Sequence, residues 1–173
     1  MSLRRKGEHA REKDRTYFPL FVNLDGVSVL VVGGGTVAER RIRSLLDFGA
    51  GITVLSPTLT AGLEQLMRDG RIIWKKGLYG KDSGTDAACF PDSVQLVLSA
   101  SDDPGVNEAV FSDCRRRGIP VNCADKKEHC DFYFPALVRS EDLVIGISSG
   151  GTDHGRVRRA AERLRGFLAR EKL

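Results

Sequence analysis

The residues with the most specific chemical meaning form a glycine-rich turn early in the chain. They read G-x-G-x-x-A between an apolar run and a helical pattern, as Gly33, Gly34, Gly35, Thr36, Val37 and Ala38. In such a turn the first glycine allows a tight bend, the second lets the backbone approach a pyrophosphate, and a small third residue lets the helix close onto the strand. Free amides at the helix N-terminus then face the phosphates. The turn predicts a dinucleotide-binding site; the alternative is a connection that binds nothing.

The end of the next predicted strand leaves the identity of the dinucleotide open. Sites for NAD usually offer Asp or Glu there to the ribose hydroxyls. This chain instead reads Ser56-Pro57-Thr58, and Ser56 is our candidate ribose contact. Nothing in that stretch repels a 2′-phosphate, so the residues alone allow both NAD and NADP.

Polar residues also follow the predicted strand at 94–98. Ser101, Asp102 and Asn107 would lie at the carboxyl edge of an open α/β sheet, where ligands bind. We expect them to contact the cofactor. The alternative is that Asp102 or Asp103 only caps the following helix.

Two later clusters complete the candidate site. Asp125 follows the predicted strand at 119–123, and an acid near a nicotinamide could remove a proton while hydride leaves the same substrate. The alternative to a catalytic role is that Asp125 is a loop carboxylate bound to solvent or to backbone amides. Ser148, Ser149 and Gly150 offer hydroxyls and amides to an anion, or form a plain loop before a helix.

Composition limits the class of protein. The chain has 173 residues, a formal net charge of +4 and 41% hydrophobic residues, so we expect one domain with or without an appendage. No apolar run could cross a bilayer and residues 1–16 hold no signal-like apolar core, which predicts a cytoplasmic protein with no membrane association. Residues 1–16 alternate in charge and predict a mobile basic arm. The arginines at 156–165 lack interleaved aromatic residues and predict a solvated helix face, with no nucleic-acid partner.

The cysteines and histidines have no metal-binding spacing. Neither zinc-ribbon cysteine pairs nor a histidine pair at i, i+4 occurs among Cys89, Cys114, Cys123, Cys130, His9, His129 and His154. We expect structural thiols in a reducing compartment and no metal.

Strand-like and helical segments alternate from residue 27 to residue 123. Strands separated by helices of about a dozen residues specify parallel βαβ units, so we expect a Rossmann-like doubly wound α/β sheet over 17–125. Asp25-Gly26 between the apolar runs at 21–24 and 27–32 predicts a β-hairpin.

The alternation stops after residue 123. Runs at 132–138 and 143–148 have no helix between them, which predicts an antiparallel strand pair within a small β segment at 126–152. An amphipathic helix follows at 153–173. Its single apolar stripe predicts packing against another subunit or against the body of the protein.

Five separated motifs add a family resemblance. They are YFPLF at 17–21, VLVVGGGTVA at 29–38, VNCAD at 121–125, CDFYFPA at 130–136 and ISSGG at 147–151. In this order they resemble the motifs of precorrin-2 dehydrogenases, the N-terminal module of siroheme synthases. The CDFYFPA run is far more specific than the glycines alone.

The resemblance implies an NAD-dependent oxidation of precorrin-2, a tetrapyrrole with eight carboxylates, to sirohydrochlorin in siroheme biosynthesis. It implies NAD as the cofactor, Asp125 as the catalytic acid or base, and a homodimer formed through the strands that follow the Rossmann part. Some members also insert iron, which would be a second activity. We expect the substrate to contact Asn122, Ser148, Ser149, Gly150 and Arg156.

The chain departs from the family pattern after Gly151. Members usually continue with Ser-Pro and a helical domain that helps to cover the substrate, whereas this chain reads Thr152-Asp153 and has one further helix. A polyanionic substrate would then rely on arginines such as Arg156, Arg158 and Arg159. The departure keeps a second hypothesis open, a non-catalytic NAD-binding sensor or tetrapyrrole carrier.

Overall fold

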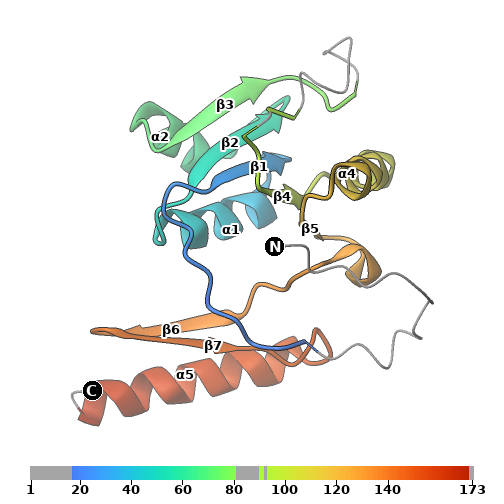
Figure 1. Ribbon diagram of the computed structural model, residues 1–173. Coiled ribbons are helices and arrows are strands. Elements are labelled where there is room, and N and C mark those ends of the chain that lie inside the picture. Colours follow the sequence, from blue (N-terminus) through green and yellow to red (C-terminus); the bar gives the residue numbers. More distant parts are fainter. Residues whose placement is uncertain (1–16, 81–89, 92, 172–173) are drawn as a thin grey trace. The chain divides into compact units, whose positions relative to one another are not determined.

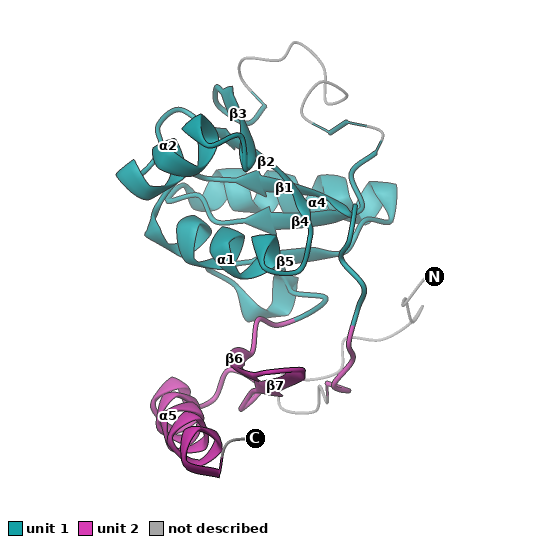
Figure 2. Ribbon diagram, turned by 90° about the vertical axis from the view of Figure 1, so that its left-hand side faces the viewer, with its two compact units in different colours: residues 1–5, 22–132 teal, residues 6–21, 133–173 magenta. Residues whose placement is uncertain are grey.

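The computed structural model describes residues 17–80, 90–91 and 93–171, and the predicted basic arm at 1–16 lies outside them. The described chain divides into two compact units, 22–132 (unit 1) and 17–21 with 133–171 (unit 2) (Figure 2). The elements of unit 1 are β1 (Ser28–Val32), α1 (Thr36–Leu46), β2 (Gly51–Ser56), α2 (Ala61–Arg68), β3 (Ile72–Lys76), β4 (Leu96–Ser99), α4 (Pro104–Arg117), β5 (Val121–Cys123) and the short 3-10 helix η2 (Lys127–His129) (Figure 1). Unit 2 holds β6 (Ala136–Ser140), β7 (Leu143–Ile147) and α5 (His154–Glu171).

Unit 1 is built on a five-stranded sheet in the order β3-β2-β1-β4-β5. All of its strand pairs are parallel, and Val32 at the end of β1 pairs with Leu55 on one side and Ser99 on the other. The chain order reverses between β1 and β4, and this switch point is where doubly wound sheets bind ligands. The predicted Rossmann-like sheet is confirmed.

The sheet is buried on both faces because its strands are continuous apolar runs. Leu30 and Val32 of β1 pack in a cluster with Val110 and Cys114 of α4. Val29 and Val31 of the same strand are also fully buried or nearly so, on the other side of the pleat. Figure 2 shows α1 and α4 on opposite faces of the sheet.

The predicted hairpin at Asp25-Gly26 is wrong, although the turn itself forms. The Val27 amide donates to the Leu24 carbonyl at 3.0 Å and Gly26 has a φ of +71°, but residues 17–24 form no strand. β1 has β2 on one edge and β4 on the other, so no edge remains for an antiparallel partner. The turn instead holds the chain against the loop before β2, where the Gly26 amide donates to the Gly49 carbonyl.

Unit 2 is an antiparallel β6–β7 pair covered by α5. The predicted strand pair is confirmed, but its first strand begins at Ala136 rather than residue 132. Val138 of β6 packs with Ala161 and Leu168 of α5 in a small core of its own. No helix in the described part of the chain is long and apolar enough to cross a membrane.

Candidate active site

Backbone hydrogen bonds continue past the ends of the strands and bring three connecting loops to one edge of the sheet. The amides of Gly33, Ala100 and Ala124 each donate to a carbonyl of the neighbouring strand, at 3.0, 2.8 and 2.8 Å. These residues begin the β1–α1, β4–α4 and β5–η2 connections. The glycine-rich turn, the Ser101 loop and Asp125 therefore share the carboxyl edge of the sheet, as predicted for a doubly wound fold.

Packing explains the first two glycines of the turn. Gly33 has a φ of +115°, and a Cβ there would lie 2.2 Å from the Ala100 carbonyl oxygen. A Cβ on Gly34 would lie 2.1 Å from the Thr58 carbonyl oxygen. Both contacts are to backbone, so neither position accepts a side chain without a shift of the main chain.

Packing does not explain the third glycine. A Cβ on Gly35 would meet no atom within 4 Å, and its φ of −84° is open to any residue. Gly35 is the N-cap of α1, whose N-terminus has no side-chain cap, and the first helical bond runs from the Glu39 amide to Gly35. The space beside Gly35 is open and no side chain caps this helix N-terminus, which leaves room for a pyrophosphate. With Ala38 fully buried against the sheet, the residues fit a dinucleotide.

Ser56 packs beneath this turn. It is buried, and its hydroxyl donates to the Thr58 carbonyl at 2.8 Å, directly under Gly34. A ribose contact by Ser56 stays a prediction. Its neighbour in the sheet is Lys76 of β3 rather than an acid.

Asn107 organises the Ser101 loop. Its side-chain oxygen accepts hydrogen bonds from the Ser99 hydroxyl at 2.7 Å and the Ser101 amide at 3.1 Å, and its side-chain nitrogen donates to the Ser101 carbonyl at 2.9 Å. Asn107 is only 2% exposed, so we propose that it positions the Ser101 loop, and a direct cofactor contact by Asn107 stays a prediction. The capping alternative holds for Asp103, which accepts from the Gly105 amide at 2.8 Å. Asp102 is exposed at the loop surface and stays a candidate contact.

Asp125 is exposed immediately after β5 and makes no ion pair within the described residues. The next residue anchors its turn, because Lys126 Nζ lies 2.8 Å from the Glu108 carboxylate of α4. This ion pair and the Ala124 bond to β4 fix the backbone on both sides of Asp125. The exposed carboxylate is accessible to a bound substrate, which a general base requires.

Asn122 is buried, unlike Asp125. Its side-chain nitrogen donates to the Phe132 carbonyl at 2.7 Å, and it is 2% exposed. The side chain ties β5 to the segment that leaves unit 1, and a substrate contact by Asn122 stays a prediction. All three residues of β5, Asn122 among them, are buried.

The described cysteines are buried thiols. Burial is the main cause that raises the pKa of Cys114 and of Cys123 to about 12, with neighbouring charges adding to it. Burial also raises the pKa of Cys130. Within the described residues no group of three or more His, Cys, Asp or Glu side chains could hold a metal ion.

The predicted substrate residues of unit 2 form hydrogen bonds within the turn before α5 and at the start of that helix. The Gly150 amide donates to Ser148 Oγ at 3.1 Å, and the Asp153 amide donates to Ser149 Oγ at 3.0 Å. These bonds shape the turn before α5 as the plain-loop alternative expects. Arg156 lies on the exposed surface of α5.

Comparisons with known proteins agree with this geometry. An NAD(P)-binding family model matches residues 20–136. The chain is 40% identical over 134 residues to the siroheme synthase of Psychrobacter sp. (strain PRwf-1), covering 78% of this chain and 26% of that protein. It is 36% identical over 152 residues to the siroheme synthase of Photorhabdus laumondii, covering 88% and 31%. The chain thus spans less than a third of these synthases.

A solved structure matches the chain more completely. SirC, precorrin-2 dehydrogenase, superposes with a TM-score of 0.71 at 30% sequence identity, over 87% of this chain and 71% of that one. The site, the family model and this match all indicate a nicotinamide cofactor. The chain belongs to the NAD(P)-binding family that includes SirC and the matching segments of siroheme synthases.

Proposed function

We propose that the chain oxidises precorrin-2 to sirohydrochlorin with NAD⁺. One observation carries the proposal. The open N-terminus of α1 beside Gly35 and the exposed carboxylate of Asp125 lie at the same edge of the sheet. The relatives named siroheme synthase and precorrin-2 dehydrogenase support the choice of substrate.

Each part of this edge has a separate task. The amides of Thr36, Val37 and Ala38 hold the pyrophosphate, and Asp102 is the candidate contact from the Ser101 loop. Bound NAD⁺ supplies a hydride acceptor. The oxidation removes two electrons and two protons, of which one proton leaves with the electrons as hydride, and Asp125 accepts the other.

The choice of NAD over NADP rests on the family resemblance. Ser56 and Lys76 at the ends of β2 and β3 include no acid that would repel a 2′-phosphate. These residues do not select between the two cofactors. From the resemblance we expect a higher kcat/KM with NAD⁺ than with NADP⁺ in parallel assays. Equal values with both would contradict the choice of NAD.

The experiment is an anaerobic assay of precorrin-2 with NAD⁺ that follows NADH and sirohydrochlorin together. We expect stoichiometric formation of both, with kcat lowered at least about 100-fold in Asp125→Asn. Asp47→Asn is the matched control, because Asp47 ends α1 and is the C-cap rather than part of the carboxyl edge. Binding of NAD⁺ without turnover would reject the enzyme and favour the sensor or carrier.

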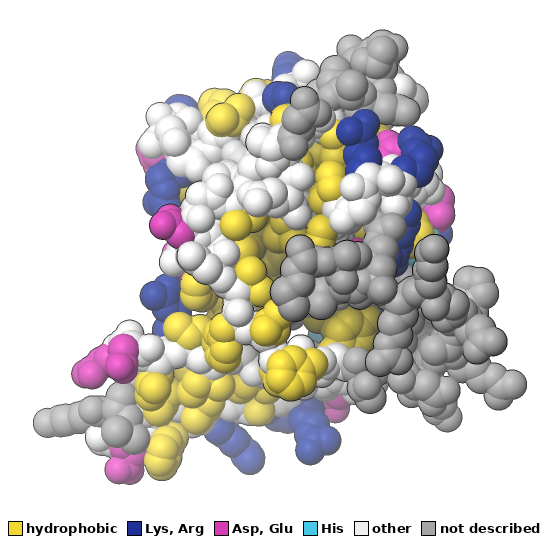
Figure 3. All heavy atoms as spheres, viewed as in Figure 1, with side chains coloured by type: hydrophobic (Ala, Val, Ile, Leu, Met, Phe, Trp, Pro, Cys, Tyr) yellow, Lys and Arg dark blue, Asp and Glu magenta, His cyan; other side chains and the backbone are white. Residues whose placement is uncertain are grey.

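We also propose that the chain forms a homodimer through unit 2. Large apolar side chains of unit 2 are exposed, including Phe18 at 86% and Phe21 at 75%, with Leu20 and Leu143. Figure 3 shows hydrophobic side chains gathered over β6 and β7. Exposed apolar patches of this kind mark association surfaces. Sedimentation should give a dimer that Phe18→Ser weakens, and a wild-type monomer at micromolar concentration would contradict the proposal.

A further inference from the structure

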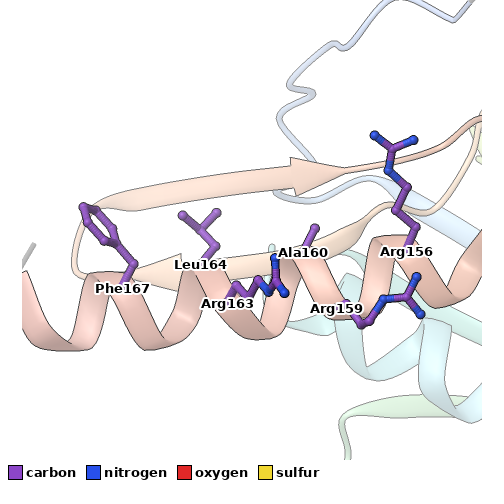
Figure 4. A pocket seen from close by; sticks show the side chains of 6 residues that line it. All are labelled: Arg156, Arg159, Ala160, Arg163, Leu164 and Phe167. Atoms are coloured by element: carbon purple, nitrogen blue, oxygen red, sulfur yellow. The ribbon is translucent and has the colours of Figure 1, made fainter.

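Three arginines form a row on one face of α5. Arg156, Arg159 and Arg163 stand at i, i+3 and i+7, which places them on one side of the helix over about 10 Å of its axis. They line an open groove of about 510 Å³ along α5, together with Ala160, Leu164 and Phe167 (Figure 4). We call this feature the α5 groove.

The arginines of the α5 groove differ from the other arginines of the helix in their partners. None of its three arginines forms an ion pair within the described residues. Other arginines of the same helix are engaged: Arg158 lies 3.3 Å from the Glu162 carboxylate, and Arg165 donates to the Leu137 carbonyl at 2.9 Å. The sequence made Arg156, Arg158 and Arg159 candidates for binding a polyanion. The structure favours Arg156 and Arg159, because Arg158 already pairs with Glu162. The groove presents three guanidinium groups that can each bind a carboxylate in a bidentate manner.

The other half of the groove is apolar. Leu164 is half-buried against the β6–β7 pair, and Phe167 is 46% exposed beyond it. A ligand that satisfies both halves has a flat apolar face and several carboxylates at its rim. A nucleic acid fits less well, because the groove has one aromatic ring and residues 17–153 carry eighteen acidic against fourteen basic side chains.

Building on the proposed function, we propose that the α5 groove binds the tetrapyrrole through its carboxylates. Arg156, Arg159 and Arg163 pair with carboxylates at the rim of the macrocycle, and Phe167 packs against its apolar face. This assigns one carboxylate contact, Arg163, and one apolar contact, Phe167, that the sequence alone did not indicate.

The test is a fluorescence titration of the full chain with uroporphyrin I, which has eight carboxylates, and coproporphyrin I, which has four. We expect Arg159→Gln and Arg163→Gln each to weaken uroporphyrin binding about fivefold, and Arg158→Gln to change it less than about twofold. Coproporphyrin should bind more weakly than uroporphyrin, and added salt should weaken both. Circular dichroism of each variant verifies that α5 remains folded.

Two results would overturn the proposal. One is an equal effect of Arg158→Gln, Arg159→Gln and Arg163→Gln on uroporphyrin binding. The other is displacement of uroporphyrin by a single-stranded oligonucleotide at lower concentration than by coproporphyrin, which would identify a nucleic-acid surface. The dehydrogenase assay tests the proposed function independently. If porphyrin binding depends on Arg159 and Arg163 but precorrin-2 is not oxidised, the proposed enzyme is rejected and the proposed tetrapyrrole site in the α5 groove stands.

Discussion

Thr60 donates its hydroxyl to the Glu39 carboxylate at 2.6 Å and so joins the N-terminus of α2 to the first turn of α1. Thr60 is also the N-cap of α2, where its oxygen accepts from the Leu63 amide at 3.2 Å. Arg43 completes the cluster by donating to the same carboxylate at 2.7 Å. The two helices that flank the glycine-rich turn are thus held together by one ionised carboxyl group.

This arrangement predicts a loss of stability in acid. The Thr60 hydrogen bond is the main cause that lowers the pKa of Glu39, with Arg43 second. Because the folded pKa is below the unfolded value of 4.5, the contribution is fully present above about pH 4.5 and is lost as the pH falls through the folded pKa. Urea unfolding at about pH 7 and about pH 3.5 should show that wild type loses more stability than Glu39→Gln does. Equal losses in both proteins would contradict this role.

The parallel sheet was predictable from the sequence because its signals are local and repeated. Apolar runs of strand length alternate with helical stripes, and each pattern matches the element that forms. The hairpin error has the same origin. Asp25-Gly26 specifies a turn locally, but only the tertiary arrangement makes β1 a central strand with no free edge.

The glycines of the turn permit a sharper prediction. Gly35→Ala should fold with a change in stability below about 1 kcal/mol, because its Cβ meets no atom within 4 Å. It should weaken NAD⁺ binding at least about tenfold, since the methyl group would occupy the space left for the pyrophosphate. Denaturant unfolding and calorimetric titration measure the two effects.

Gly34→Ala provides the contrast. Its Cβ would lie 2.1 Å from the Thr58 carbonyl oxygen, so we expect a loss of about 2 kcal/mol or more in stability. If Gly35→Ala were the more destabilised of the two, or bound NAD⁺ as wild type does, the open pyrophosphate site would be refuted.

The network around Asn107 predicts that its loss weakens both the fold and NAD⁺ binding. Asn107→Ala leaves the buried Ser99 hydroxyl and the Ser101 backbone without their partners, which should cost about 2–3 kcal/mol and raise KM for NAD⁺. Asp102→Asn, at an exposed position of the same loop, should change stability by less than about 0.5 kcal/mol. A stable Asn107→Ala protein with an unchanged KM would remove its positioning role.

Side-chain direction limited what the sequence could predict of the site. Polar residues after each strand indicated the correct edge, and Asp102 and Asp125 are exposed there. Asn107 and Asn122 are equally polar and equally close in sequence, yet both are buried and bond to backbone carbonyls. Such bonds depend on the register between neighbouring strands and loops, which no spacing rule gives.

The raised thiol pKa values predict that the described cysteines are unreactive in the folded protein. With a pKa of about 12 for Cys114 and Cys123, about one molecule in 10,000 holds either as thiolate at about pH 8. A Cys89→Ser protein, which removes the one cysteine outside the described residues, should therefore react with Ellman's reagent only in denaturant. Adding Asp47→Cys, at the exposed end of α1, should restore one fast thiol and serves as the positive control. Rapid modification of the folded Cys89→Ser protein would show that the core around β5 opens readily, contrary to the burial of Cys123 and Cys130.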